Sequence, residues 1–378
     1  MTQSKKTTNA EKLKGFARYV QLEQFVSAEL ENPDPYLVTD ILSVRSRNKE
    51  HDQHTFAESN GAVKLYSITE LQYLFKNARR IFGDDRDHLV KEILFELSKM
   101  KNRRNLAGSP ADADLQLLRL NFPNFSEAID QIEFAAALSN LSNQQWFQMS
   151  PLLLLGEAGV GKTAFAQAFA KLLGVYFKRI DVGTATTGAI FSGLSLGWGS
   201  GHTGEIFKTI NESETANPLI LLDEVDKMSR GSSYPVEPIL LSLLEKESAE
   251  SFREEAVQLH FNCKHFLWVA TANNLDAMSE PLKSRFNIVN VRAPNAVETQ
   301  QIIRSIYRKI RANNPWGICF KSEISDSVIE ALVSYSPREL TRILQIAFGK
   351  AAKRGGKEIC TGDLQVNKKL VTKTIGFL

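Results

Sequence analysis

A glycine-rich turn between a run of leucines and a helical segment has the residue types and spacing of a phosphate-binding loop. Residues 156–163 read GEAGVGKT, which matches G-x-x-x-x-G-K-[ST]. Glycines leave backbone N–H groups free to point at phosphate oxygens, and the next helix adds the positive end of its dipole. Lys162 supplies charge for the β and γ phosphates and Thr163 a hydroxyl for Mg²⁺. The residues expected to contact the nucleotide are Gly156, Glu157, Ala158, Gly159, Val160, Gly161, Lys162, Thr163 and Ala164.

Polar residues at the ends of two further apolar runs complete the predicted site. The run 219–222 is followed by Asp223 and Glu224. A buried strand would place Asp223 where its carboxylate holds Mg²⁺ through water, and Glu224 where it polarises the attacking water. A solvated acidic pair is the alternative. The run 266–270 is followed by Asn273, whose amide we expect to orient water against the γ-phosphate.

These apolar runs predict the strands of a parallel sheet. Strands are expected at 152–155, 176–182, 219–222, 266–270 and 288–291. Strands that alternate with helices, with polar residues at their carboxyl ends, favour a three-layer α/β domain. Beyond Pro294 the pattern becomes helical. Helices are expected at 297–312, 326–335 and 338–354, with a capped helix start at 361–364.

The order of these segments predicts three domains. We expect a mainly helical N-terminal domain and linker at 1–110, the α/β domain at 111–294, and a small helical lid with a short tail at 295–378. No catalytic constellation stands out in the first domain, so partner or substrate recruitment and oligomerisation are its expected roles. Its basic cluster is interpreted as a charged linker, with nucleic-acid contact as the alternative. The cluster consists of Lys99, Lys101, Arg103 and Arg104.

Composition excludes several classes of protein. The 378 residues are 43% hydrophobic and 24% charged with a net charge of +3, which is ordinary for a globular chain and does not choose a partner. No run approaches the roughly 20 apolar residues of a membrane span, and the start has no signal core, so the cytoplasm is expected. The cysteines lack metal or disulfide spacing and are expected to be buried thiols, and the histidines are expected to be solvated. These residues are Cys263, Cys319, Cys360, His51, His54 and His88.

Residues 121–366 resemble the ATPase module of the AAA+ superfamily, and within it that of the Lon protease branch. The motifs that carry the resemblance are LLDEVDKM at 221–228, LLSLLEKESAESF at 240–252, VATANNLDAMSEPLKSRF at 269–286 and YSPRELTRIL at 335–344. The resemblance implies Asn273 as sensor one, Arg285 as an arginine finger that reaches a neighbouring subunit's ATP, and Arg338 as sensor two. An arginine acting in trans requires a ring, so a hexamer is implied as well. Surface charges are the alternative for both arginines, and Arg342 lies one helical turn from Arg338.

The segment 181–206 has about the length of the Lon segment that carries the substrate-gripping pore loop. That register implies Trp198 as the pore aromatic, and Phe191 is a second candidate. Glycines around an aromatic make a mobile loop whose ring can press against a threaded chain. Gly199 and Ser200 replace the family's apolar residue and glycine, and a packed tryptophan is the alternative.

The resemblance implies an ATPase that uses ATP and Mg²⁺ in a homo-oligomeric, hexameric ring to remodel, unfold or thread a protein substrate. Lon places a Ser–Lys peptidase after the lid, whereas only residues 368–378 follow it here. We therefore expect no peptidase activity from this polypeptide, and a separate effector protein as a candidate partner. A nucleotide-gated assembly scaffold or a nucleic-acid-associated ATPase is the alternative function.

Overall fold

The computed structural model describes residues 61–141, 146–229 and 234–364, and it divides into two compact units. Each unit is assembled from separate pieces of the chain. Of the described residues, the sheet unit contains those in the ranges 106–187, 213–244 and 265–364. The hairpin unit contains those in the ranges 61–105, 188–212 and 245–264. This division differs from the three consecutive domains expected, because two later segments pack with the N-terminal part.

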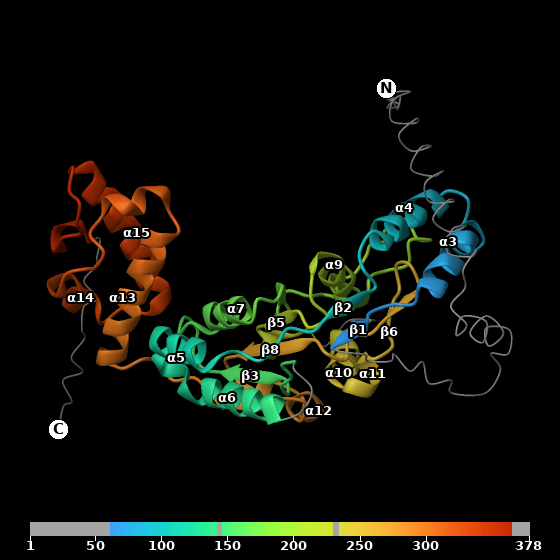
Figure 1. The fold of residues 1–378 in the computed structure, drawn as a ribbon, viewed down its shortest axis with the longest axis horizontal. Helices are drawn as coiled ribbons and strands as arrows, with labels where there is room; N and C mark the ends of the chain where they lie inside the picture. The colour runs from blue at the N-terminus through green and yellow to red at the C-terminus, as the bar shows by residue number, and fades with distance from the viewer. Residues whose placement is uncertain (1–60, 142–145, 230–233, 365–378) are drawn as a thin grey trace, which may run out of the picture. The chain divides into compact units, whose positions relative to one another are not determined.

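A parallel five-stranded sheet flanked by helices forms the centre of the sheet unit (Figure 1). Its strand order is β4 (Phe177–Asp181), β5 (Leu219–Asp223), β8 (Leu267–Ala272), β3 (Leu152–Leu155) and β9 (Asn287–Asn290). The first of these in the chain, β3, lies between β8 and β9, so its carboxyl end is in the interior of the sheet. The α/β fold class and all five expected strands are confirmed, with ends that differ by at most two residues.

Burial on both faces explains why these strands read as continuous apolar runs. Leu152, Leu153 and Leu154 are all buried, and so is every residue of β5. Three helices share one core with alternate residues of β3, and the rings of Phe125 and Phe165 stack in it at 4.5 Å. These helices are α5 (Asp112–Asn121), α6 (Ser126–Leu141) and α7 (Lys162–Leu173).

Short elements fill the connections of the sheet unit. They are the 3-10 turns η1 (Pro123–Phe125), η2 (Val225–Lys227) and η3 (Leu275–Ala277), and the helices α10 (Val236–Leu244) and α12 (Glu280–Lys283). The turn η2 follows β5 directly, and η3 follows β8, so both lie beyond the carboxyl ends of the sheet.

The C-terminal part of the sheet unit is a helical lid with its own core. Its elements are α13 (Ala296–Ala312), η4 (Pro315–Cys319), α14 (Asp326–Leu332), α15 (Pro337–Lys353) and η5 (Thr361–Asp363). The rings of Tyr307 and Phe348 stack at 5.0 Å in that core. Asn295 and Ser336 begin α13 and α15 with capping boxes. The three expected helices are confirmed, and the expected helix start at 361–364 is a single 3-10 turn.

Among its described residues, the hairpin unit combines two small antiparallel ladders with five helices. One ladder joins β1 (Ala62–Lys64) to β2 (Arg103–Asn105), and the other joins β6 (Phe252–Glu254) to β7 (Leu259–Phe261). A bridge between Tyr66 and Phe261 links the two ladders. The helices are α3 (Ile68–Phe82), α4 (Asp87–Ser98), α8 (Ala189–Ser192), α9 (Glu205–Glu212) and α11 (Lys246–Ala249).

The expected linker at 99–104 is wrong in part, because its end is a strand. Arg104 lies in β2 with 5% of its surface exposed. Its guanidinium donates to the carbonyls of Lys101 and Ile210. Lys99 forms an ion pair with Glu96 at 2.6 Å. Lys99 and Arg104 are therefore engaged within the hairpin unit, which weakens the nucleic-acid alternative.

Cysteine burial also differs from expectation. Cys263 is buried as expected, but Cys319 and Cys360 are exposed, because they lie at the end of η4 and at the cap of η5. His88 is exposed as expected, while His51 and His54 lie outside the described residues. Within the described ranges no helix is both long and apolar enough to cross a membrane.

Candidate functional site

The phosphate loop joins the end of β3 to the start of α7, and its glycines are required by its geometry. Gly159 and Gly161 have positive φ angles of 89° and 109°, which glycine adopts readily and other residues rarely do. A Cβ on Gly156 would overlap the carbonyl oxygen of Val291. Two glycines thus permit the turn, and the third permits a close approach to the backbone after β9.

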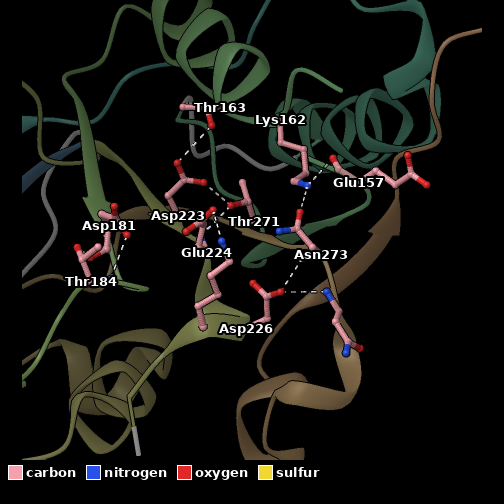
Figure 2. Close-up of polar contacts among 12 residues, drawn as sticks. Glu157, Lys162, Thr163, Asp181, Thr184, Asp223, Glu224, Asp226, Thr271 and Asn273 are labelled. Atoms are coloured by element: carbon pink, nitrogen blue, oxygen red, sulfur yellow. Dashed lines mark hydrogen bonds and ion pairs between the residues drawn. The ribbon is translucent and has the colours of Figure 1, made fainter. Parts of the chain in front are cut away.

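Lys162 points back into this loop. Its Nζ donates to the carbonyls of Gly156 and Glu157, the latter at 3.1 Å, and to Asn273 Oδ1 at 2.9 Å (Figure 2). Only 8% of the lysine is exposed. The structure therefore brings together the predicted phosphate-binding lysine and the predicted sensor asparagine, which are 111 positions apart.

Burial lowers the pKa of Lys162 below its ordinary value. Nearby carboxylates oppose this effect, and the guanidinium of Arg338 adds to it. The carboxylates belong to Asp226, Asp223 and Glu224. A buried ammonium near a second cation gains favourable interactions when phosphate oxygens come within reach, which suits a polyphosphate ligand.

Asp223 ends β5 with both carboxylate oxygens engaged. Thr163 Oγ1 donates to Oδ2 at 3.3 Å, and Arg179 Nε pairs with the same oxygen at 2.8 Å. Thr271 Oγ1 donates to Oδ1. The two residues predicted to hold Mg²⁺, Thr163 and Asp223, therefore lie side by side (Figure 2).

The donor chemistry at Thr163 and Asp223 fits Mg²⁺. A hydroxyl and a carboxylate are hard oxygen donors, and Mg²⁺ typically takes one or two such protein ligands while phosphates and water supply the others. Among the residues that the structure describes, no group of three or more His, Cys, Asp or Glu could hold a metal. A nucleotide-associated cation therefore suits this site better than a cage made by the protein alone.

Glu224 follows Asp223 in a left-handed conformation, with φ of 58°. Its backbone N–H donates to Thr271 Oγ1 at 3.0 Å, so one hydroxyl contacts both acids of the site. Its carboxylate pairs with Lys227 at 2.7 Å and is 39% exposed. Water can thus reach the predicted base.

Asp226 fixes the turn that carries Asn273. Its Oδ2 accepts hydrogen bonds from the backbone N–H groups of Asn273 and Asn274, each at 3.0 Å (Figure 2). Sequence reasoning did not assign roles to Asp226, Lys227, Thr271 or Arg179. Asp226 and Lys227 belong to the acidic motif after β5, and Thr271 is a hydroxyl on a buried strand, so these three carried a usable signal.

The two predicted arginines lie in different places. Arg338 is in the first turn of α15, and its Cβ is 4.0 Å from where a Cβ on Gly159 would lie, so the lid contributes a cation beside the phosphate loop. Arg285 follows α12, and its Nη1 donates to Ser284 Oγ at 3.4 Å. A role for Arg285 toward another subunit stays a prediction.

The two candidate pore aromatics differ sharply in exposure within the hairpin unit. Trp198 is 70% exposed, whereas Phe191 is fully buried in α8. A buried ring cannot press against a chain in this conformation, so we retain Trp198 alone as the candidate. The packed-tryptophan alternative does not describe the structure.

Comparison with known proteins supports the interpretation of the sheet unit. Residues 152–294 match the model of the ATPase family associated with various cellular activities (AAA). The chain is 31% identical over 212 residues to the mitochondrial Lon protease homolog of Mus musculus, and 30% identical over 210 residues to Lon protease 1 of Bacillus subtilis. These matches cover 56% and 53% of this chain, but only 22% and 27% of the relatives. The chain therefore corresponds to about a quarter of those proteins.

A likeness to a solved structure is more distant. The chain resembles a mutant form of Thermotoga maritima RuvB with a TM-score of 0.42 and 17% identity, over 63% of this chain and 67% of that one. At that score the likeness supports no conclusion about the site. The sequence matches carry the comparison: residues 152–294 match the AAA ATPase family model, and this region of the chain is similar in sequence to a part of the Lon proteases.

Proposed function

We propose that this protein hydrolyses ATP with Mg²⁺ in a homo-oligomeric ring, and that the cycle remodels, unfolds or threads a protein substrate. One observation carries the hydrolytic part: Lys162, Asp223 and Asn273 converge on the phosphate loop from three different strand ends. The relationship to Lon supports the protein-directed part. A separate effector protein is a candidate partner.

In this proposal most of the catalysis is positioning and charge stabilisation. Lys162 leaves the loop carbonyls to bind phosphate oxygens, and Arg338 adds a second positive charge. Thr163 and Asp223 hold Mg²⁺, which supplies charge to the β and γ phosphates when bound.

Two further residues act on the attacking water. Glu224 accepts the proton of the water, and Asn273 orients it. Lys227 pairs with one oxygen of the Glu224 carboxylate, Oε1, and so lies directly beside the proposed base. Lys227 therefore influences how readily the base is available.

The test of hydrolysis is Glu224→Gln, measured by nucleotide binding and steady-state turnover. We expect ATP to bind while kcat falls about 100-fold or more, because loss of a general base typically costs that much. Glu330→Gln, an exposed change in α14, is the matched control and should leave both quantities near wild type. Undiminished hydrolysis by Glu224→Gln would refute the assignment.

The ring is tested by mixing two inactive proteins. If Arg285 completes the site of a neighbour, Arg285→Ala and Lys162→Ala are each defective alone, and a mixed assembly regains activity at interfaces that join an intact arginine to an intact lysine. No recovery in mixtures shown to co-assemble would contradict a role in trans. Mixed samples of two Lys162→Ala preparations provide the baseline.

Substrate handling is tested at Trp198. We expect Trp198→Ala to reduce the amount of protein processed per ATP hydrolysed, because the exposed ring is the proposed grip. Trp198→Phe keeps an aromatic and should retain most of the coupling. Wild-type coupling in Trp198→Ala would remove the threading model while leaving the ATPase proposal intact.

A further inference from the structure

The loop that carries Trp198 is a narrow hairpin. Leu194 and His202 exchange two backbone hydrogen bonds, at 2.8 and 3.0 Å. Near the tip, Trp198 N–H donates to Ser195 O at 3.1 Å, and Gly201 N–H donates to Trp198 O at 3.0 Å. Because the exposed ring stands at this tip, its direction depends on how the base of the hairpin is held.

The base is bound to the chain around β6 by three contacts. Glu255 N–H donates to Ser192 O at 2.7 Å, and Leu196 N–H donates to Ala256 O at 3.2 Å. The third contact is made by a side chain: Gly204 N–H donates to Glu254 Oε1 at 2.9 Å. Both arms of the hairpin are therefore tied to residues 254–256.

Gly193 makes room for the carboxylate of Glu254, and Gly204 lets the two arms of the hairpin lie close together. A Cβ on Gly193 would overlap Glu254 Oε1, and a Cβ on Gly204 would overlap the backbone of Phe191 and Gly193. Gly193 also has a φ of 73°, which favours glycine. The glycines of this segment thus serve close packing at the base, in addition to any mobility at the tip.

Glu254 is an unusual residue to bury. It is fully inaccessible, and Oε2 has no hydrogen-bond partner among the described residues. Burial raises the pKa of Glu254 to about 8, although the N–H groups of Gly204 and Ala256 favour its ionised form. The other charged or titratable groups near it are Glu255, Lys208 and Cys263. Burying an acid with one unsatisfied oxygen costs free energy, and we attribute the presence of Glu254 here to the hairpin arms that it positions.

The opposite side of the β6–β7 ladder is joined to the N-terminal segment. Asn262 N–H donates to Leu65 O at 2.8 Å, and the ring of Tyr66 meets that of Phe261 edge-on at 5.9 Å. The Tyr66 hydroxyl donates to the carbonyls at the end of α4. Residues 61–105 are therefore packed on the same ladder that holds the Trp198 hairpin.

We propose that Glu254 is a positioning residue that locks the Trp198 hairpin onto a base shared with residues 61–105, so that the aromatic tip and the N-terminal segment move as one body. This deepens the proposed substrate grip and rests on that function for its biological meaning. The lock itself is a property of the hairpin unit and can be measured without substrate. It assigns the N-terminal segment a mechanical role in addition to the recruitment expected from sequence.

The lock is tested by hydrogen exchange on the full chain, with three variants. Glu254→Ala removes the acceptor of Gly204 N–H, so exchange at Gly204 should rise about 10-fold or more. Glu254→Gln keeps a carbonyl acceptor and should retain most of the protection. Glu255→Gln is the control, since only the backbone of Glu255 contacts the hairpin, and it should not change exchange.

A spin label at the tip gives an independent readout of the same lock. Gly199→Cys is suitable, because a Cβ there meets no atom within 4 Å. The exposed cysteines are first removed by Cys319→Ser and Cys360→Ser, and the buried Cys263 is kept. We expect a mobile label with Glu254→Ala and a restricted one with Glu254→Gln.

The outcomes separate the lock from the proposed function. Unchanged exchange and label mobility in a folded Glu254→Ala protein would overturn the lock. If Glu254→Ala does not fold, a rise of about 10-fold or more in exchange at Gly204 of Glu254→Gln, relative to wild type, overturns the lock. If Glu254→Ala loosens the hairpin but the amount of protein processed per ATP is undiminished, the lock is supported and the proposed substrate grip by Trp198 is refuted. The shared base predicts that Tyr66→Ala also raises exchange at Gly204, and protection unchanged there would show that the N-terminal segment is not part of the body.

Discussion

Thr271→Val would test how the two acids of the nucleotide site are held. The Thr271 side chain is buried, and its hydroxyl both accepts from Glu224 N–H at 3.0 Å and donates to Asp223 Oδ1. Valine has nearly the same shape, so the change removes these two contacts without leaving a cavity. It leaves one partly buried N–H and one carboxylate oxygen without that partner.

The expected cost follows from those two groups. An unsatisfied buried polar group costs about 1–3 kcal/mol, and Asp223 keeps its contacts with Thr163 and Arg179, so we expect a total of roughly 2–4 kcal/mol. For a unit of this size that lowers Tm by about 4–16 °C. Because Glu224 then loses the contact that fixes its backbone, we also expect kcat to fall about 10-fold or more.

The assay combines thermal unfolding with ATP turnover per folded protein. Thr271→Ser keeps the hydroxyl and should stay within about 1 kcal/mol of wild type. Thr209→Val is a second control, because this buried threonine bonds a carbonyl of its own helix, away from the acids. Wild-type stability and turnover in Thr271→Val would refute the reasoning, and loss of stability alone would refute the link to Glu224.

Three further changes have defined outcomes. Gly156→Ala places a methyl against a backbone carbonyl and should lower the free energy of unfolding in urea by about 1–3 kcal/mol. The control is Gly349→Ala in α15, where a Cβ meets no atom within 4 Å, and it should raise the free energy of unfolding by about 0.5–1 kcal/mol. For Glu254, the folded pKa of about 8 lies above the ordinary value of 4.5. The contribution of the protonated carboxyl group to the free energy of unfolding is therefore complete below pH 4.5 and is lost as the pH rises to 8. Glu254→Gln should remove that decline, which is at most about 1.4 kcal/mol per pH unit. Arg179→Met removes the guanidinium from Asp223 Oδ2 and should lower the Mg²⁺ concentration for half-maximal ATPase about 2–5-fold. An increase would contradict competition between the guanidinium and the metal.

The sheet unit could be predicted because its signals are local. Residues 152–163 contain a complete buried strand, the turn glycines and the start of a helix within one short stretch. The acids after β5 and the asparagine after β8 follow apolar runs, and parallel strands bring such ends to one edge of a sheet. The proximity of these residues to Lys162, including the hydrogen bond between Lys162 and Asn273, could therefore be predicted from the sequence.

The missed features depend on pairing between distant segments. The strands β1, β2, β6 and β7 have three residues each, which is too short to show a period of two. Arg179 reaches Asp223 only because β4 lies beside β5, with Asp181 opposite Asp223. Sequence spacing does not give that register, and nothing in the apolar pattern of the N-terminal helices shows that they pack with residues 245–264.

The hairpin unit is assembled from segments far apart in the sequence, and this has a consequence for the nascent chain. Glu70 pairs with His260, 190 positions later in the chain, at 2.6 Å. At about 5–20 residues per second, the ribosome makes the second of these residues roughly 10–40 s after the first. During that interval α3 has an apolar face, including Leu71 and Phe75, without the ladder that later lies beside it. Synthesis that stops before residue 264 therefore leaves the N-terminal helices as a substrate for chaperones and proteases.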